Sequence, residues 1–144
     1  MELQGRVWKD GNVWLIEVPS INIVTQGRTK KNAFAMLQDA VKEIILSYFD
    51  LDLTIDKIVV TDRKLGCIGL KIDSLNILLS LLLIRQREIS GVTIRSASKA
   101  LGSNSPNQYA QYEKGRINIS FEMYEKLLHA INPKSTYTVN VING

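Results

Sequence analysis

Residues 3–18, LQGRVWKDGNVWLIEV, constrain the fold of this chain more than any other stretch. Two apolar runs lie on either side of Asp10-Gly11, and glycine accepts the positive φ that a two-residue hairpin turn requires. Pro19 follows the second run and cannot continue a strand ladder, because it has no backbone N–H to donate. The pattern therefore predicts an antiparallel hairpin at the start of the chain.

The rest of the first half predicts more strands and one helix. Residues 22–27, NIVTQG, predict a third short strand, and Thr29 can cap a helix over residues 30–46. The apolar residues of this helix fall at spacings of three and four and make one face: Ala33, Phe34, Leu37, Ala40, Val41, Ile44 and Ile45. Two further strands are predicted at 57–62 and 66–72. Residues 1–72 are thus expected to form a small antiparallel sheet with one covering helix.

Two tryptophans flank the predicted hairpin turn. Trp8 and Trp14 could form a partner-binding surface, but aromatic residues often fill strands. We therefore favour packing on the sheet for both.

No catalytic set is visible in the sequence. A metal-dependent nuclease needs clustered carboxylates, whereas Glu17, Glu43 and Asp62 are scattered one to a segment. Cys67 and His129 are each the only residue of their kind, which excludes an internal disulfide and a zinc site built from His and Cys. We expect no enzyme activity, no catalytic residues, no metal and no cofactor. An active nuclease is kept as an alternative.

The second half predicts helices only. Helices are expected over residues 74–90, 93–102, 105–114 and 120–131. Ser105-Pro106 is a strong start signal, because proline in the first helical turn loses no hydrogen bond. Two short helices around LGSNS predict a helix-turn-helix unit. The fold class is therefore α+β: the sheet domain, 1–72, followed by an all-α helix-turn-helix DNA-binding domain, 73–133.

The tail, residues 134–144, alternates apolar and polar side chains. The run STYTVNVI predicts a strand, and a single strand needs an edge to pair with. That edge belongs either to a second copy of the chain, which would make the tail a dimerisation element, or to the first sheet.

The third predicted helix of the second half carries an unusual row of amides. Tyr109 and Tyr112, three residues apart, can pack this helix inward, which leaves Asn107, Gln108 and Gln111 pointing away. Amide side chains can pair bidentately with the N6 and N7 atoms of adenine in the major groove. We expect these three residues to read DNA bases. The alternative is a polar face that only contacts solvent.

Charge favours the DNA-binding interpretation. Residues 85–116 hold six basic and two acidic residues, a net charge of +4, whereas residues 1–72 hold ten basic and nine acidic residues. Clustered positive charge is what contact with phosphates requires, and a hydroxyl at a helix N-terminus can add to it. The residues expected to contact phosphate are Arg95, Lys99, Ser105, Lys114 and Arg116.

A resemblance to a known family lies in residues 13–45, VWLIEVPSINIVTQGRTKKNAFAMLQDAVKEII. This stretch resembles the N-terminal domain of HicB-type antitoxins, in which a strand pair, a T-x-G-x-T turn and an alanine-rich helix follow one another. Thr25, Gly27 and Thr29 stand at the turn positions, and Ala33 and Ala40 match the helix. The family's Leu-Pro-Gly-Cys run is VPSINIV here. The resemblance implies a small, catalytically empty relative of the ribonuclease H fold.

The second half is similar to the lambda-repressor-type helix-turn-helix family, whose pattern is T-Q-x-x-L-A-x-x-L-G followed by W-E-x-G. The residues on or near this pattern are Thr93, Ser98, Leu101, Gly102, Tyr112, Glu113 and Gly115. The resemblance implies a structural role for Glu113. Ile94 stands where the family has a glutamine that contacts a phosphate, and the turn before the helix that starts at Pro106 appears one residue longer.

Together the two resemblances imply an antitoxin of a type II toxin–antitoxin pair. It would mask a HicA-type RNA-cleaving toxin and repress its own operon by binding operator DNA as a homodimer or higher oligomer. The alternative is a stand-alone helix-turn-helix repressor whose N-terminal domain dimerises or senses a ligand. We expect a cytoplasmic protein with no membrane contact, because the N-terminus lacks a signal-peptide core and the apolar run 78–84 is short.

Overall fold

The predicted hairpin is present in the computed structural model, which describes residues 1–50 and 57–143. Strands β1 (Leu3–Asp10) and β2 (Val13–Val18) pair antiparallel on either side of Gly11, whose φ is 58°. Strands β3 (Ile23–Gly27), β4 (Ile58–Asp62) and β5 (Cys67–Ile72) extend the sheet. The strand order is β3-β2-β1-β5-β4, and every neighbouring pair is antiparallel.

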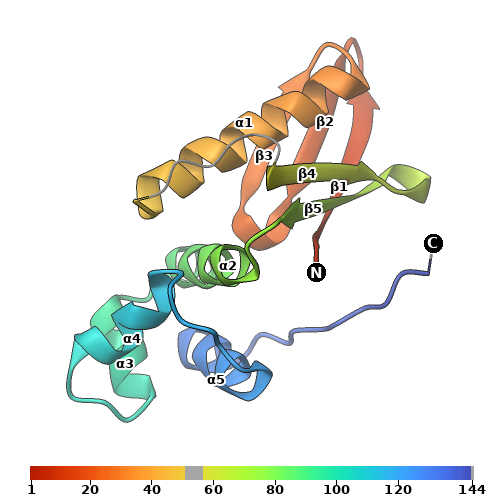
Figure 1. The fold of residues 1–144 in the computed structure, drawn as a ribbon. Coiled ribbons are helices and arrows are strands. Elements are labelled where there is room, and N and C mark those ends of the chain that lie inside the picture. Colours follow the sequence, from red (N-terminus) through yellow and green to blue (C-terminus); the bar gives the residue numbers. More distant parts are fainter. Residues whose placement is uncertain (51–56, 144) are drawn as a thin grey trace.

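Helix α1 (Lys30–Tyr48) covers one face of this sheet (Figure 1). The Thr29 side chain caps it by accepting a hydrogen bond from the backbone N–H of Asn32 at 3.0 Å. The helix buries one stripe against the sheet, made of Ala33, Leu37, Val41 and Ile45. The α+β prediction for the first half is confirmed.

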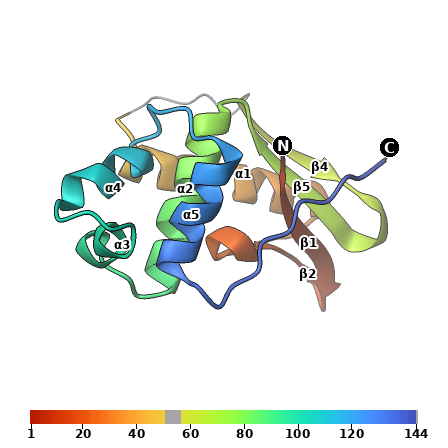
Figure 2. The ribbon, with the colours of Figure 1, turned by 90° about the horizontal axis from the view of Figure 1, so that it is seen from below.

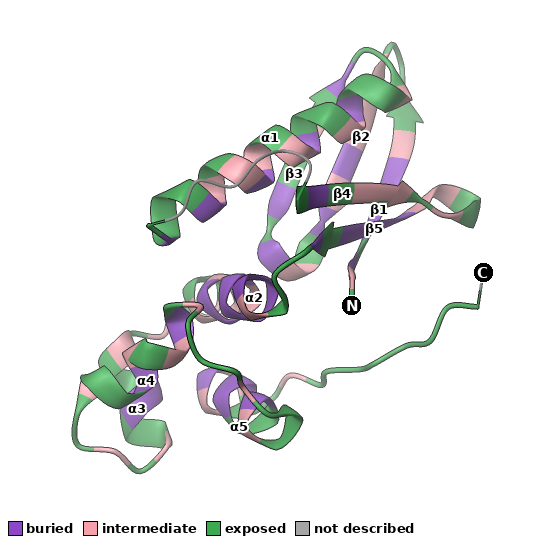
Figure 3. Ribbon diagram, viewed as in Figure 1, coloured by how far each residue is buried: buried purple, intermediate pink, exposed green. Residues whose placement is uncertain are grey.

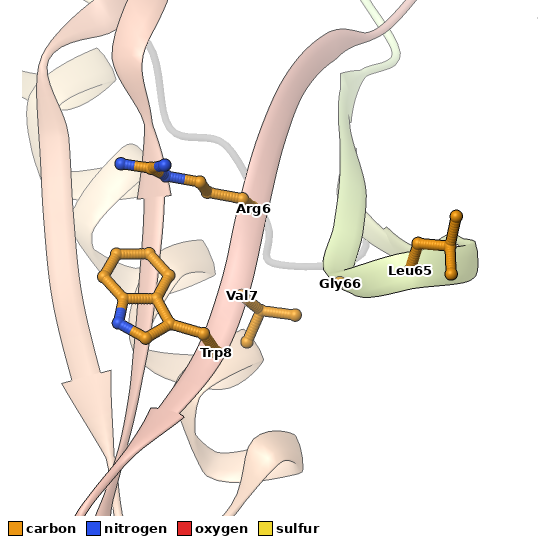
Figure 4. A pocket seen from close by; sticks show the side chains of 5 residues that line it. All are labelled: Arg6, Val7, Trp8, Leu65 and Gly66. Atoms are coloured by element: carbon orange, nitrogen blue, oxygen red, sulfur yellow. The ribbon is translucent and has the colours of Figure 1, made fainter.

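The two tryptophans lie on opposite faces of the sheet. Trp14 packs against the sheet core on the face that α1 covers, with the ammonium of Lys30 5.9 Å from its ring centre. Trp8 lies half-buried on the other face, which none of the described helices covers, and the Arg6 guanidinium lies 5.1 Å from its ring centre (Figure 4). Both tryptophans thus lie on the sheet, and of the two only Trp14 packs against the hydrophobic core.

Helix α2 (Leu75–Ile89) lies between the sheet and the remaining helices and packs on both. Figure 3 shows that buried residues occur on several of its sides. One side joins the sheet core through Ile77, Leu78, Leu81 and Ile84, and the other joins the core of the helical half through Leu79 and Leu83. This double contact explains why its sequence is apolar nearly all round. No helix in the described ranges is long and apolar enough to cross a membrane.

Helices α3 (Ile94–Ala100), α4 (Pro106–Glu113) and α5 (Phe121–Ile131) follow α2 in the described residues. Figure 2 shows α5 alongside α2, with α3 and α4 on one side of this pair and the sheet on the other. Each new helix begins after a residue whose hydroxyl oxygen accepts a hydrogen bond from a backbone N–H of the first turn, in turn Thr93, Ser105 and Ser120. The predicted helices are confirmed to within two residues at each end. A domain boundary at residue 72 stays a prediction, since α2 belongs to both cores.

The described part of the tail, up to residue 143, forms no strand in the single chain. Residues 134–143 leave α5 as an extended segment that returns towards the sheet (Figure 1), where Ile142 lines a small hollow with Glu2, Arg63 and Gly69. Val139 and Val141 are exposed. Of the two edges considered for this segment, the first sheet does not pair with it, and pairing with a second copy stays a prediction.

The double role of α2 predicts a cooperative unfolding reaction. Replacing the fully buried Leu81 by alanine is expected to lower the free energy of unfolding by about 2–5 kcal/mol, because it leaves a cavity. Urea titrations measure the change. Tryptophan fluorescence reports on the sheet and circular dichroism reports on the helices, and both signals should change in one transition with the same midpoint.

The matched control is Leu75→Ala on the same helix. Leu75 is 47% exposed, so its removal is expected to change the free energy of unfolding by roughly 0.5 kcal/mol or less. Transitions that separate between the two probes would show instead that the sheet and the helices unfold independently.

Candidate nucleic-acid interface

Helices α3 and α4 are fixed relative to each other by the turn that joins them. The buried Ser98 hydroxyl donates to the carbonyl oxygen of Ser105, and the Ser103 hydroxyl accepts from the Ser105 N–H at 3.2 Å. Gly102, with φ of 83°, closes α3 in the left-handed conformation that glycine tolerates. The sequence LGSNS predicted two short helices joined by a turn, and the structure has this arrangement, with hydrogen bonds holding the turn.

The inner side of α4 is anchored on α2. Arg87 of α2 donates to both carboxylate oxygens of Glu113, at 2.5 and 3.1 Å, and the two side chains are only 15% and 9% exposed. This paired hydrogen bond raises the pKa of Arg87, so that the guanidinium stays charged. The Ser80 hydroxyl adds a hydrogen bond to the Tyr112 carbonyl at 2.9 Å. The structural role that the resemblance implied for Glu113 matches this contact.

Tyr109 fills the space beneath α4. Its side chain is fully buried in the core of the helical half. Burial raises the pKa of the Tyr109 phenol far above its usual range, and the negative charge of Glu113 raises it further. The ring therefore remains neutral and packs as an apolar group. Tyr112 is partly buried against the same core, as predicted.

The outer side of α4 carries the three amides. Asn107, Gln108 and Gln111 are all exposed, and their side chains make no hydrogen bond to another residue in the described ranges. Their amide groups are thus free to contact an external partner. Their assignment as base readers stays a prediction.

Four exposed cations lie on α3 and at the C-terminal end of α4. Arg95, Lys99, Lys114 and Arg116 are exposed, and none of them forms an ion pair with a residue that the structure describes. The two other basic residues of the 85–116 segment point inward. Arg87 pairs with Glu113, and Arg85 pairs with Glu88 and donates to the Ile21 carbonyl at 2.8 Å. The net charge of +4 in this segment therefore resides on the outward-facing residues.

The fifth residue expected at a phosphate, Ser105, serves as the N-cap of α4. Its oxygen accepts a hydrogen bond from the Asn107 N–H at 3.3 Å. The hydroxyl hydrogen is not used by this contact, so Ser105 can still donate to a phosphate oxygen. The exposed Asn104 lies in the turn just before it and was not anticipated. The only feature of the sequence that could have pointed to Asn104 as a further polar residue of this surface is its position in a polar turn.

Ile94 explains one departure from the helix-turn-helix pattern. Its side chain is half-buried and packs on the core of the helical half, so it does not replace the phosphate contact of the family's glutamine. Arg95 and Ser96, the next two residues, are exposed in the first turn of α3. A phosphate contact at this place would have to come from them.

The three carboxylates singled out in the first half lie on different elements, Glu17 on β2, Glu43 on α1 and Asp62 on β4. Asp62 is hydrogen-bonded to the Lys30 ammonium at 2.6 Å, and Glu43 is exposed on α1. Residues 1–50 and 57–143 contain no group of three His, Cys, Asp or Glu side chains that could hold a metal ion.

Comparison with known protein families supports the helix-turn-helix prediction for the helical half. Residues 83–137 match the helix-turn-helix family, from the second half of α2 to the start of the tail. The match does not reach the sheet. A comparison with curated proteins found no match. A domain of this family indicates DNA binding and transcriptional regulation.

The anchoring of α4 can be tested at Glu113. Glu113→Gln is expected to lower the free energy of unfolding by about 3 kcal/mol, because it leaves the mostly buried Arg87 charge without its partner. Thermal or urea unfolding measures the change. The control is Glu122→Gln, which breaks the exposed Glu122–Lys126 pair and should leave the transition where it is. Equal shifts in both variants would contradict a special role for the buried pair.

Proposed function

Because residues 83–137 are a helix-turn-helix domain, we propose that the protein is a transcriptional regulator whose helix α4 reads operator DNA. The observation that carries this proposal is the division of α4 into two sides. Tyr109 and Glu113 fix the inner side, while Asn107, Gln108 and Gln111 are exposed on the outer side. A helix held rigidly with free amides outward is suited to the major groove.

Each exposed residue has a role in this proposal. The amides of Asn107, Gln108 and Gln111 contact base edges and supply specificity. The phosphate contacts come from Arg95, Lys99, Ser105, Lys114 and Arg116, and they supply affinity that falls as salt rises. Since such readers bind two half-sites, the operator complex contains a homodimer or a higher oligomer.

We also propose a role for the sheet half, based on the resemblance of residues 13–45 to HicB-type antitoxins. In this role the sheet half covers a HicA-type RNA-cleaving toxin and blocks it sterically, so the chain itself needs no catalytic residues. Its support is the T-x-G-x-T turn of Thr25, Gly27 and Thr29 ahead of α1. A stand-alone repressor whose sheet half dimerises or senses a ligand is the alternative.

Base-contacting and phosphate-contacting residues are expected to affect DNA binding differently when they are replaced by alanine. With an operator selected from random duplexes, Gln111→Ala is expected to weaken specific binding by about 1–3 kcal/mol and to relax the preference at one base position. Lys114→Ala should weaken binding to all sequences alike and lower the salt dependence by about one counterion. Fluorescence anisotropy over a salt series measures both effects.

Gln26→Ala is the matched control, because Gln26 is an exposed glutamine on β3 of the sheet half. It should leave DNA affinity unchanged. If Gln111→Ala and Lys114→Ala change the sequence specificity and the salt dependence of DNA binding in the same way, the assignment of Gln111 to a base and of Lys114 to a phosphate is wrong. If no duplex is enriched by the selection, the proposed DNA binding itself fails.

The antitoxin role is tested by co-expression with a small protein encoded next to this chain. Relief of growth arrest, together with co-purification of the two proteins, is the expected result. A homo-oligomer that never restores growth would favour the stand-alone repressor. Metal-dependent RNA cleavage by the pure protein, abolished by Glu43→Ala or Asp62→Ala, would favour the nuclease.

A further inference from the structure

The backbone that follows α4 lies in close contact with the core of the sheet half. Gly115 comes two residues after the last residue of α4, with φ of 70°, a left-handed conformation common just after a helix. A Cβ built on it would lie 2.7 Å from the Cδ1 atom of Ile77 and 3.2 Å from the Cε1 atom of Phe49. Both of these residues are only 5% exposed and belong to the sheet core.

The left-handed conformation does not by itself require such a contact. Gly91, between α2 and α3, has a nearly equal φ of 66°. A Cβ built on Gly91 has no described atom within 4 Å beyond those of its chain neighbours. At Gly115, in contrast, a methyl group has no room unless Ile77 or Phe49 moves, because protein interiors are closely packed. The contact is thus a separate feature of this position.

Phe49 is held in place from the sheet side. It caps the C-terminal end of α1, and its N–H donates to the Ile45 carbonyl at 2.8 Å. The phenol of Tyr48, the last residue of α1, donates to the carboxylate of Glu88 in the last turn of α2 at 2.7 Å. The end of α1 is therefore fixed to one end of α2 by Tyr48, while Phe49 lies with Ile77, in the first turn of α2, around Gly115.

The contact lies next to two residues proposed to bind DNA. Gly115 directly follows Lys114, whose N–H donates to the Gln111 carbonyl at 3.3 Å. Glu113 and the Tyr112 carbonyl are bonded to side chains of α2. The contact at Gly115 adds α1, which belongs to the sheet half, to the supports of this end of α4.

We propose that Phe49, together with Ile77, is a positioning residue for DNA recognition. From the sheet half, it sets where α4 ends and therefore where Gln111 and Lys114 lie relative to the duplex. The inference rests on the proposed DNA binding and adds that the sheet half takes part in recognition without touching DNA. A displacement of about 1 Å is enough to make a binding site too loose. A ligand or partner that moves the end of α1 consequently changes operator affinity.

The first test removes the ring of Phe49. Phe49→Leu keeps an apolar side chain in the core but lacks the ring atom nearest to Gly115. With an operator selected from random duplexes, it should weaken specific binding at least about fivefold, the loss of one base contact. Binding to a scrambled duplex should stay within about twofold, because phosphate contacts do not depend on sequence. Phe49→Met should restore most of the affinity, since its flexible side chain can fill the gap left by the ring.

The matched control is Leu37→Ala on the same helix. Leu37 is fully buried in the sheet core, about 18 Å from Phe49 along the helix axis. Its removal leaves a cavity and should lower the thermal midpoint, yet operator affinity should not change. Equal losses of operator affinity in Phe49→Leu and Leu37→Ala would mean that affinity follows stability alone, which overturns the inference.

The second test approaches the contact from the other side. Gly115→Ala and Gly91→Ala both place alanine in a left-handed conformation, but only Gly115→Ala drives a methyl group against Ile77 and Phe49. Gly115→Ala should weaken operator binding at least about fivefold, and Gly91→Ala should leave it unchanged. Adding Ile77→Val to Gly115→Ala removes the atom at 2.7 Å and should restore part of the affinity. Equal affinities of the two glycine variants, or no gain from Ile77→Val, would contradict the inference.

A measurement on the free protein separates this inference from the DNA-binding proposal. An aromatic ring shifts the NMR resonances of hydrogens that lie near it. Phe49→Leu should therefore move the backbone resonances of Gly115, Lys114 and Gln111, whereas Leu37→Ala should leave them in place. Unchanged resonances in Phe49→Leu overturn the inference. A selection that enriches no duplex contradicts the DNA-binding proposal instead, and because the resonances are measured without DNA, the two failures are distinguishable.

Discussion

The packing of α2 between two hydrophobic cores is the interaction on which the rest of the structure depends. Leu81 is buried against the sheet and α1, and Leu83 is buried against α5 and its neighbours. Separating the helix from either core would expose a leucine-rich surface to water at a cost of about 25 cal/mol for each Å². At the junction Arg85 and Gln86 also donate to backbone carbonyls of the loop after β2, at 2.8 and 2.5 Å. The sheet and the helix-turn-helix domain are thus joined through one shared element.

The same helix orients the surface proposed to contact DNA. Arg87 holds α4 by its ion pair with Glu113, and the Ser80 hydroxyl donates to the Tyr112 carbonyl of the same helix. These contacts occupy the inner side of α4 and leave Gln111 and its amide neighbours outward. Because the pairing is mostly buried, it also removes Arg87 from the charge available to phosphates. The position of the outward amides therefore depends on a polar contact and on the packing of Tyr109 beneath them.

The sheet has two faces of different character. Val7 and Ile16 pair across β1 and β2 on the face that α1 covers, whereas Arg6 and Trp8 lie on the opposite face. A strand alternates its side chains, so one hairpin supplies both the core and an exposed aromatic and basic surface. The turn between β4 and β5, which carries Leu65, borders the exposed face (Figure 4).

The sequence by itself determined the elements. The Asp10-Gly11 turn and the caps at Thr29 and Ser105 act within a few residues of themselves, so the hairpin and the helices could be predicted locally. The outward amides also followed from helical spacing. Only the tertiary structure decided that β5 lies between β1 and β4, that α2 serves two cores, and that Arg87 points inward while Lys114 remains exposed. These features depend on contacts between residues that are far apart in the sequence, and a local sequence pattern does not predict which distant residues will meet.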